Sequence, residues 1–203
     1  MGKKIQKGFK RIIDILSAFS IIICLLPLLL ILAVLIKVTS KGPVFYLSKR
    51  VGINGKTFDM VKFRTMVDNA VNIGAGIETY KHDPRITVIG VFLRKWSIDE
   101  IPQVFNIIKG DMSFIGPRPA LPHQVEKYTA EERKRLEMRP GISGWAQVRG
   151  RNLLSWKERI KKDIFYIDNF SLFLDIKIFF MTFWVILSQK GVYGNDGKVK
   201  DYE

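Results

Sequence analysis

Cysteine and histidine are nearly absent from this sequence. Its 203 residues include one cysteine, Cys24, and two histidines, His82 and His123. One cysteine excludes an intrachain disulfide, and nothing indicates an oxidising compartment. The histidines lie far apart without the spacing of metal ligands. We interpret both as surface residues and disfavour a zinc site or a histidine general base.

Acidic residues are few relative to basic ones. Lys and Arg number 33 against 19 Asp and Glu, which gives a formal net charge of +14. This excess extends beyond the apolar N-terminal part and favours an anionic partner, whether lipid headgroups, nucleic acid or a phosphorylated small molecule. A hydrophobic content of 47% excludes a disordered chain. The length predicts one domain plus an anchor.

Charge is missing altogether from Ile15 to Ile36, a run of 22 residues with lysines on both sides. The run is long enough to cross a membrane. Because no small-residue cleavage site follows it, we set a signal peptide aside. A single transmembrane helix is the simplest interpretation, and it predicts that the rest of the chain lies across the membrane from the N-terminus.

Pro27 supports a different interpretation of the same run. A proline inside a helix removes a backbone hydrogen bond and bends the helix. Split at Pro27, the halves are roughly 22 Å and 15 Å long, and neither crosses a hydrocarbon core of about 30 Å. We therefore predict a re-entrant helix-break-helix over residues 1–40, with both ends on one side of the membrane. Residues 41–203 are predicted to form a domain that rests on the membrane surface.

Residues 41–66 have the pattern of a β-hairpin. Apolar and polar residues alternate on both sides of the turn pair Asn54-Gly55. In the second strand, Lys62 and Arg64 are two residues apart and point to the same face, a spacing suited to gripping a phosphate. A solvated edge strand explains the same residues, and the pattern alone favours that alternative.

An adjacent pair of carboxylates, Asp99 and Glu100, follows at the start of a predicted helix. Ser97 to Glu100 matches a capping box, in which serine and glutamate side chains satisfy the first backbone N–H groups. Pro102 favours a later start, with Asp99 as the N-cap, because no internal hydrogen bond is then lost. In both cases the pair lies in the first turn, where the helix dipole and nearby arginines favour ionised carboxylates. An ionised carboxylate serves as a nucleophile or a metal ligand.

Arginines stand on both sides of this helix, which is predicted to end at Gly110. Arg94 precedes it. Arg118 follows in a Gly-Pro-Arg-Pro stretch, where the prolines restrict the backbone and present the guanidinium at low entropic cost. The predicted buried face of the helix consists of Ile101, Phe105 and Ile108. An ordinary rigid turn explains the prolines alone, but the clustering of carboxylates and arginines favours phosphate chemistry.

Several ordered blocks of the sequence carry a resemblance to a known family. They are KFRTM at 62–66, DPRIT at 83–87, LRKWSIDEIPQVFNIIKGDMSFIGPRP at 93–119 and PGISGWAQVRGR at 140–151. The chain resembles the bacterial sugar transferase family, the monotopic polyprenyl-phosphate phosphoglycosyl transferases, over nearly its whole length. Its short length resembles the minimal, single-domain members.

The resemblance implies a two-step, ping-pong transfer catalysed by the domain at 41–203. Asp99 attacks the β-phosphate of a UDP-sugar, releases UMP and holds a covalent phosphosugar. Polyprenyl phosphate, in bacteria undecaprenyl phosphate, then accepts the phosphosugar. The family cofactor is Mg²⁺, with Glu100 and Asp99 as its ligands. The phosphate-binding residues implied are Lys62, Arg64, Arg94 and Arg118, and weaker nucleotide or sugar contacts are Arg149, Arg151 and Asp163.

The resemblance also implies a location and a fold. The enzyme is expected at the cytoplasmic face of the bacterial inner membrane, in contact with membrane lipid, where it performs the first membrane step of glycoconjugate assembly. The fold class expected is α/β, with the re-entrant helix, interfacial amphipathic helices and a small β-sheet in one compact domain. From pattern alone, the aromatic segment between Phe170 and Trp184 fits an interfacial helix and a buried core helix equally. The oligomeric state is not predicted.

Two other functions compete with the transferase. A membrane-tethered basic module that holds nucleic acid or lipid explains the charge, but it gives no role to the carboxylate pair, since acidic groups beside phosphates weaken binding. We therefore expect no nucleic-acid partner. A Mg²⁺-dependent diphosphatase that uses water instead of a lipid acceptor is the second alternative.

Overall fold

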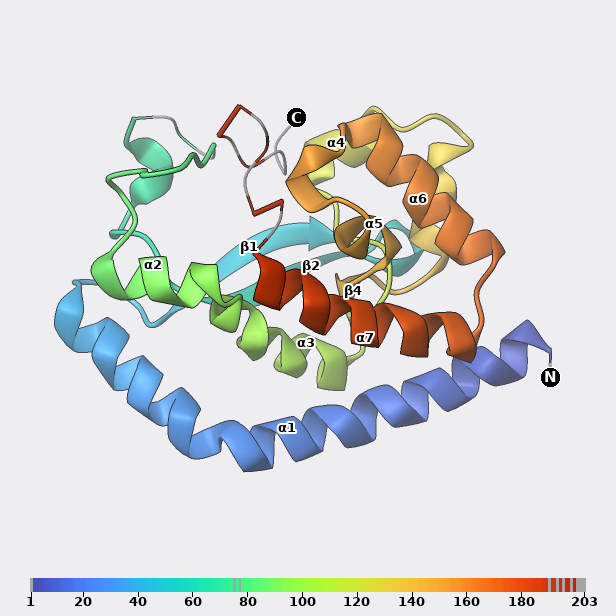
Figure 1. Cartoon of the computed structure of the whole chain (residues 1–203), viewed down its shortest axis with the longest axis horizontal. Helices are drawn as coiled ribbons and strands as arrows, with labels where there is room; N and C mark the ends of the chain where they lie inside the picture. The colour runs from blue at the N-terminus through green and yellow to red at the C-terminus, as the bar shows by residue number, and fades with distance from the viewer. Residues whose placement is uncertain are drawn as a thin grey trace.

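The computed structural model is a mixed fold of helices and small sheets, described over residues 2–74, 76, 78–189, 191–192, 194, 196–197 and 199 (Figure 1). Its α-helices are α1 Lys3–Thr39, α2 Val88–Lys95, α3 Val104–Lys109, α4 Pro122–Glu126, α5 Trp145–Val148, α6 Trp156–Asp168 and α7 Leu172–Ser188. Its strands are β1 Phe45–Val51, β2 Thr57–Phe63, β3 Ser113–Ile115 and β4 Gly141–Ser143. The mixture confirms the predicted combination of helices with small sheets.

The predicted hairpin is confirmed. β1 and β2 pair antiparallel, from Phe45↔Phe63 to Val51↔Thr57. The turn between them places Asn54 and Gly55 at φ values of 55° and 76°. Asparagine and glycine tolerate this left-handed conformation best, which is why this pair makes the turn.

β3 and β4 form a second, parallel pair, with Ser113 opposite Gly141. The chain leaving β3 passes very close to the segment that enters β4. A Cβ on Gly116 would lie 2.3 Å from the carbonyl oxygen of Arg139, so only glycine fits. This close approach fixes where the Gly-Pro-Arg-Pro stretch begins.

α1 is a single helix that bends instead of breaking. The helical assignment continues through Pro27, and Figure 1 shows the helix curving beneath the rest of the molecule. Both halves contact the domain: Lys10 Nζ lies 2.7 Å from Asp175 Oδ2, and Ile36 packs in a cluster with Phe63. The predicted helix-break-helix thus takes the form of one bent helix, because a proline removes one hydrogen bond and leaves the flanking turns helical.

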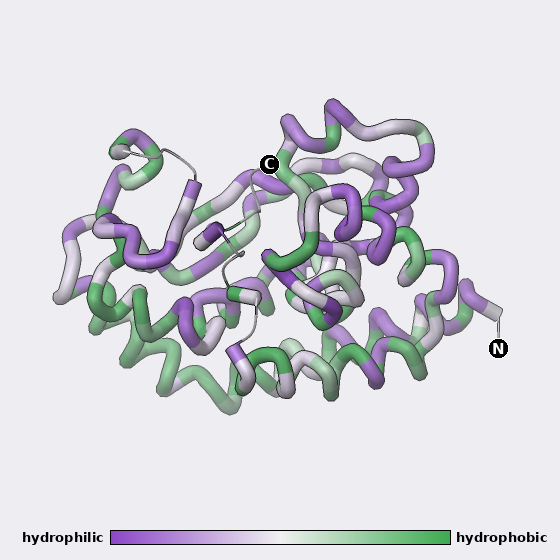
Figure 2. Tube along the Cα trace, turned by 45° about the horizontal axis from the view of Figure 1, so that its top comes forward, coloured by the Kyte–Doolittle hydropathy of each residue, from purple (hydrophilic) through white to green (hydrophobic). Residues whose placement is uncertain are grey.

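Among the described residues, α1 is the one helix long and apolar enough to cross a membrane, judged by length and composition. Only 11% of its most apolar window is buried against the domain. Figure 2 shows hydrophobic residues along much of its course. Length and composition fit a re-entrant helix and a single span alike.

α7 exposes an apolar face. Its buried residues are Asp175 and Ile178, whereas Phe173 is 77% exposed and Trp184 is 72% exposed. The alternative of a buried core helix is therefore wrong. The inner side of α7 packs on a cluster built around Tyr166, whose hydroxyl donates to Asp175 Oδ1 over 2.7 Å.

The segment after Trp96 differs from its prediction in two respects. Ser97 takes a left-handed conformation at φ 56° and makes no side-chain cap, so the capping box is wrong. Asp99 as N-cap is wrong as well, because the N-cap positions are Ser97 for the 3-10 helix and Gln103 for α3. In an α-helical turn the Pro102 ring would clash with the carbonyl group of Ile98; Ile98–Gln103 winds as a 3-10 helix, and α3 begins at Val104. This start turns Phe105 outward, where it is 45% exposed. The buried residues of α3 are Val104, Asn106 and Ile107.

Candidate active site

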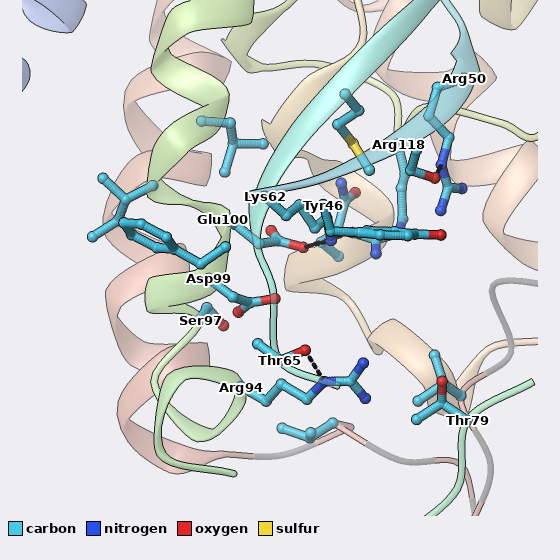
Figure 3. Close-up of a pocket in the computed structure, with 18 of the residues that line it drawn as sticks. Tyr46, Arg50, Lys62, Thr65, Thr79, Arg94, Ser97, Asp99, Glu100 and Arg118 are labelled. Atoms are coloured by element: carbon cyan, nitrogen blue, oxygen red, sulfur yellow. Dashed lines mark hydrogen bonds and ion pairs between the residues drawn. The ribbon is translucent and has the colours of Figure 1, made fainter. Parts of the chain in front are cut away.

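A cavity of about 710 Å³ lies between the hairpin, the 3-10 helix at Ile98–Gln103, α5 and α7. A cavity of this size accommodates a drug-sized or nucleotide-sized ligand. Part of its charged lining comes from five segments of the chain: Lys62, Arg94, Asp99, Glu100, Arg118 and Arg151, of which Figure 3 labels the first five.

Asp99 and Glu100 lie in the first turn of the 3-10 helix, as predicted. Glu100 Oε1 accepts a hydrogen bond from Lys62 Nζ over 2.6 Å, and Arg118 Nη1 lies 3.9 Å from the same oxygen. The side chains of Lys62 and Glu100 are 17% and 18% exposed, so their charges interact in a poorly solvated environment. Lys62 therefore links the hairpin directly to the carboxylate pair.

Burial raises the pKa of Asp99 to about 6. The negative charge of Glu100 also raises this pKa, whereas Lys62 and Arg94 lower it. The ordinary value for aspartate is about 3.9. Most of the Asp99 population is therefore ionised at pH 7, in agreement with the expectation, but its protonated form appears at a much higher pH than for an exposed aspartate.

The arginines of the cavity come from separate elements. Arg94 extends from α2, and its Nε donates to Thr65 Oγ1 over 2.8 Å, leaving the guanidinium facing the cavity in Figure 3. Arg118 lies in the loop after β3, as expected. Burial lowers the pKa of Arg151, which interacts electrostatically with Glu100 and with Arg118. The structure thus brings Arg94, Arg118 and Arg151 to one cavity.

Arg64 lines the cavity and is held by backbone carbonyl groups. Its Nη1 donates to the carbonyl oxygen of Lys41 over 2.6 Å, and its Nη2 donates to the carbonyl oxygen of Ser40 over 2.8 Å. The side chain is buried at the C-terminal end of α1, where unpaired carbonyl groups attract a cation. Arg64 lies one residue beyond the end of β2, and its backbone N–H still donates to the Val44 carbonyl oxygen, so its predicted role at a phosphate stays a prediction.

Arg149 and Asp163, which were predicted as nucleotide or sugar contacts, both contact other side chains of the protein. Arg149 is exposed, packs over the Trp145 ring and is not among the residues that line the cavity. Asp163 lines the cavity wall, but its Oδ2 accepts from Arg135 Nη2 over 2.6 Å in a fully buried ion pair. Arg135 Nη2 also lies 3.2 Å from the Arg118 carbonyl oxygen, so this pair supports the loop that carries Arg118.

The sequence interpretation missed three buried cations in the cavity lining, Arg50, Arg135 and Arg159. Arg50 is 5% exposed and donates to Ser48 Oγ and to the carbonyl oxygen of Pro119. Arg159 is 4% exposed on α6 and donates to Asn152 Oδ1. The available sequence signal is the strand period of two, which puts Ser48 and Arg50 on the same face of β1, and both are buried there.

The carboxylate pair is compatible with a hard divalent cation. No group of three or more His, Cys, Asp or Glu side chains suited to a metal occurs in the described part of the chain. Mg²⁺ typically needs one or two carboxylates together with substrate phosphate oxygens and water. Asp99 and Glu100, adjacent in the cavity, supply such a pair.

Carboxylates surrounded by cations, in a cavity beside exposed apolar helices, define a class of site for phosphorylated substrates. Comparison with known protein families agrees with such a site. The model of the family described as "Bacterial sugar transferase" matches residues 5–189 of this chain. The chain belongs to the bacterial sugar transferase family and is a sugar-phosphate transferase.

Individual relatives are similar to this chain over most of its length. "Uncharacterized sugar transferase EpsL" of Bacillus subtilis is 39% identical over 90% of this chain and 89% of its own length. "Exopolysaccharide production protein ExoY" of Rhizobium meliloti is 38% identical over 91% of this chain and 88% of its own. "Undecaprenyl-phosphate galactose phosphotransferase" of Salmonella typhimurium is 38% identical over 95% of this chain, which spans 43% of that longer protein.

Proposed function

We propose that this chain transfers a phosphosugar from a UDP-sugar to polyprenyl phosphate and releases UMP. The observation that carries the proposal is Asp99, a buried carboxylate at the cavity wall beside Glu100 and among three arginines and a lysine. Relatives named for undecaprenyl phosphate support the choice of acceptor. The position of this step, as the first membrane reaction of glycoconjugate assembly, is part of the proposal.

In the first step, a carboxylate oxygen of Asp99 attacks the β-phosphorus of the UDP-sugar. The bond from that phosphorus to the oxygen bridging to the α-phosphate breaks, and UMP leaves with the bond's electrons. Lys62, Arg94 and Arg118 offset the charge of the diphosphate. Phosphoryl transfer depends mainly on such positioning and electrostatic stabilisation.

In the second step, an oxygen of polyprenyl phosphate attacks the same phosphorus. The bond to the Asp99 oxygen breaks, which frees the carboxylate and gives a polyprenyl-diphosphate-sugar. Asp99 must therefore be ionised to react and must leave as a carboxylate. A pKa of about 6 allows both near neutral pH.

Glu100 and Asp99 are the residues that would hold Mg²⁺. The bound cation would neutralise charge on the diphosphate oxygens. Lys62 Nζ lies 2.6 Å from Glu100 Oε1, so the lysine offsets part of the negative charge of this carboxylate. Loss of activity on chelation of divalent cations, and its return on addition of Mg²⁺, tests the assignment.

The contacts of α1 support the membrane arrangement that we propose. Both halves of the helix contact the same domain, which supports a re-entrant helix with Pro27 at its bend and both ends on the cytoplasmic side of the inner membrane. The exposed apolar face of α7 would lie against the same surface. The cavity then receives a soluble nucleotide sugar and a lipid-borne acceptor at headgroup depth.

UMP release without acceptor tests the proposed chemistry. Purified full-length chain in detergent, incubated with Mg²⁺ and each member of a panel of UDP-sugars, should release about one UMP per enzyme with its preferred donor. Asp99→Asn should abolish the release, whereas Asp59→Asn, on the exposed side of the hairpin, should retain it. Continuous UMP release in the absence of polyprenyl phosphate would support the diphosphatase. Release by Asp99→Asn at the rate of the unmodified enzyme would reject Asp99 as nucleophile.

A further inference from the structure

Two cations share one aromatic ring outside the cavity. The guanidinium carbon of Arg149, at the end of α5, lies 4.4 Å from the Trp145 ring centroid, and Lys177 Nζ of α7 lies 5.8 Å from it. Phe165 of α6 stacks on the same ring at 5.8 Å. Trp145 itself is 9% exposed, whereas Arg149 and Lys177 are exposed. The ring thus gathers two accessible cations from different elements.

No carboxylate offsets these two charges within the described residues. Each recorded ion pair involves other side chains, and the nearest acidic residue along α7, Asp175, is bound to Lys10 and Tyr166. Like charges held near one another repel, although the ring attracts each of them. The arrangement therefore has the electrostatic character of an anion site.

The position of Lys177 indicates which anion fits. Helical spacing places Lys177 beside Phe173, Phe180 and Trp184, which are 77%, 67% and 72% exposed. The lysine therefore lies at the edge of the exposed apolar face of α7. A long cationic side chain beside exposed aromatic rings is typical of the boundary between hydrocarbon and water.

We propose that Arg149 and Lys177, packed on Trp145, bind the headgroup phosphate of an anionic bilayer lipid. Arginine offers a fork of N–H donors to phosphate oxygens, and lysine adds a compact charge. The adjacent apolar face of α7 would contact the acyl chains of the same lipid. Neither cation lines the cavity, so this site is separate from the one proposed for substrates. It rests on the membrane placement proposed above and adds a preference for anionic lipid.

Lipid retention tests the site. Full-length protein in mixed micelles of phosphatidylglycerol or phosphatidylcholine is examined by native mass spectrometry and by thermal unfolding. The double variant Arg149→Gln, Lys177→Gln should lose about tenfold in phosphatidylglycerol retention. The matched control Lys157→Gln, Lys161→Gln removes the same charge from exposed positions on α6 and should retain the lipid as the unmodified chain does. Phosphatidylglycerol should raise the unfolding temperature of the control more than that of the double variant.

Four results would overturn the site. One is unchanged phosphatidylglycerol retention in the double variant. A second is a drop in unfolding temperature that is equal in both lipids while retention stays intact, which would leave the cations a purely structural role. A third is stabilisation by inorganic phosphate equal to that by phosphatidylglycerol, which would make a soluble anion the ligand. A fourth is a raised KM for the UDP-sugar in Arg149→Gln with lipid retention intact, which would return Arg149 to the donor site.

Failure of the membrane placement is distinguishable from failure of this site. If the unmodified chain does not partition into vesicles of either composition, the membrane placement itself is wrong. If it partitions equally into both and the double variant does the same, only the anionic-lipid site is wrong.

Discussion

At the scale of single residues, Asp99 is subject to opposed electrostatic effects. Burial and the neighbouring Glu100 favour its protonated form, whereas Lys62 and Arg94 favour the carboxylate, and the balance puts its pKa at about 6. A group that is protonated cannot attack phosphorus. The rate of the first half-reaction should therefore fall at low pH, and the pH at which it falls depends on the charges that surround Asp99. We call this fall the acid limb of the pH profile.

Lys62→Gln should shift this acid limb to higher pH. Removing the lysine removes a charge that lowers the pKa of Asp99, so the carboxylate becomes protonated at a pH above 6. The measurement is the rate of UMP release from pH 5 to 8, with Lys49→Gln, on the exposed part of the same hairpin, as control. An acid limb at the same pH in Lys62→Gln would show that Lys62 does not act on Asp99.

Arg64 is predicted to matter for stability more than for substrate binding. Arg64→Lys retains the charge but cannot reach the carbonyl groups of Lys41 and Ser40 together. A hydrogen bond to a charged group contributes about 1.5–3 kcal/mol, so thermal unfolding in detergent should shift markedly downward. In Arg94→Lys, by contrast, the KM for the UDP-sugar should rise with little change in unfolding temperature. A raised KM with an unchanged unfolding temperature in Arg64→Lys would instead make Arg64 a phosphate-binding residue.

The residue types of the site could be predicted from the sequence, but their partners could not. The Asp99-Glu100 pair and Arg118 are marked by local spacing and by prolines. The contacts of Arg64 could not be predicted, because its partners lie more than twenty residues away, at the end of α1. The packing of Arg149 on the Trp145 ring was not predicted either, because the sequence motif does not mark the two residues as partners.

At the scale of elements, the confirmed predictions are those that rest on residues typical of turns. The hairpin followed from alternation around Asn54-Gly55, and α3 ends at Gly110, which takes φ 100°. The start of α3 was harder to predict than its end. Pro102 lies in a 3-10 turn where an α-helical turn was expected, and the buried face of α3 is therefore rotated away from Phe105. A one-residue shift in register decides burial in so short a helix.

α1 offers the clearest test at this scale. Pro27→Leu restores a backbone N–H, and a straight helix of 37 residues would extend about 55 Å, enough to cross a membrane. Straightening would pull one half away from the domain and break the contact of Lys10 with Asp175 or of Ile36 with Phe63. We expect lower thermal stability and altered access of an N-terminal cysteine label in inverted vesicles. Cys24→Ser provides the background for labelling.

The same labelling decides between the two membrane arrangements. In the unmodified sequence, a re-entrant α1 places the N-terminus and the domain on the same side of the membrane. Labelling of the N-terminus from the side opposite the domain would instead support the single span.

At the scale of the whole molecule, the arrangement combines an exposed apolar surface with a cationic cavity. α1 and α7 expose apolar side chains, while the hairpin, α2 and the loop after β3 bring charge to one place (Figures 1 and 3). Composition predicted both properties, as a long uncharged run and an excess of basic residues. Composition does not predict which basic side chains line the cavity. Arg50 and Arg159, for example, reach the cavity lining only through tertiary packing.

The central claim is that Asp99 carries the phosphosugar between two substrates. The most direct measurement is the intact mass of the full-length chain after incubation with its preferred UDP-sugar and Mg²⁺, without acceptor. The account predicts an added mass of one phosphosugar, which is absent in Asp99→Asn and lost when polyprenyl phosphate is added. An unmodified mass under conditions that release UMP, or an adduct that persists in Asp99→Asn, would contradict it.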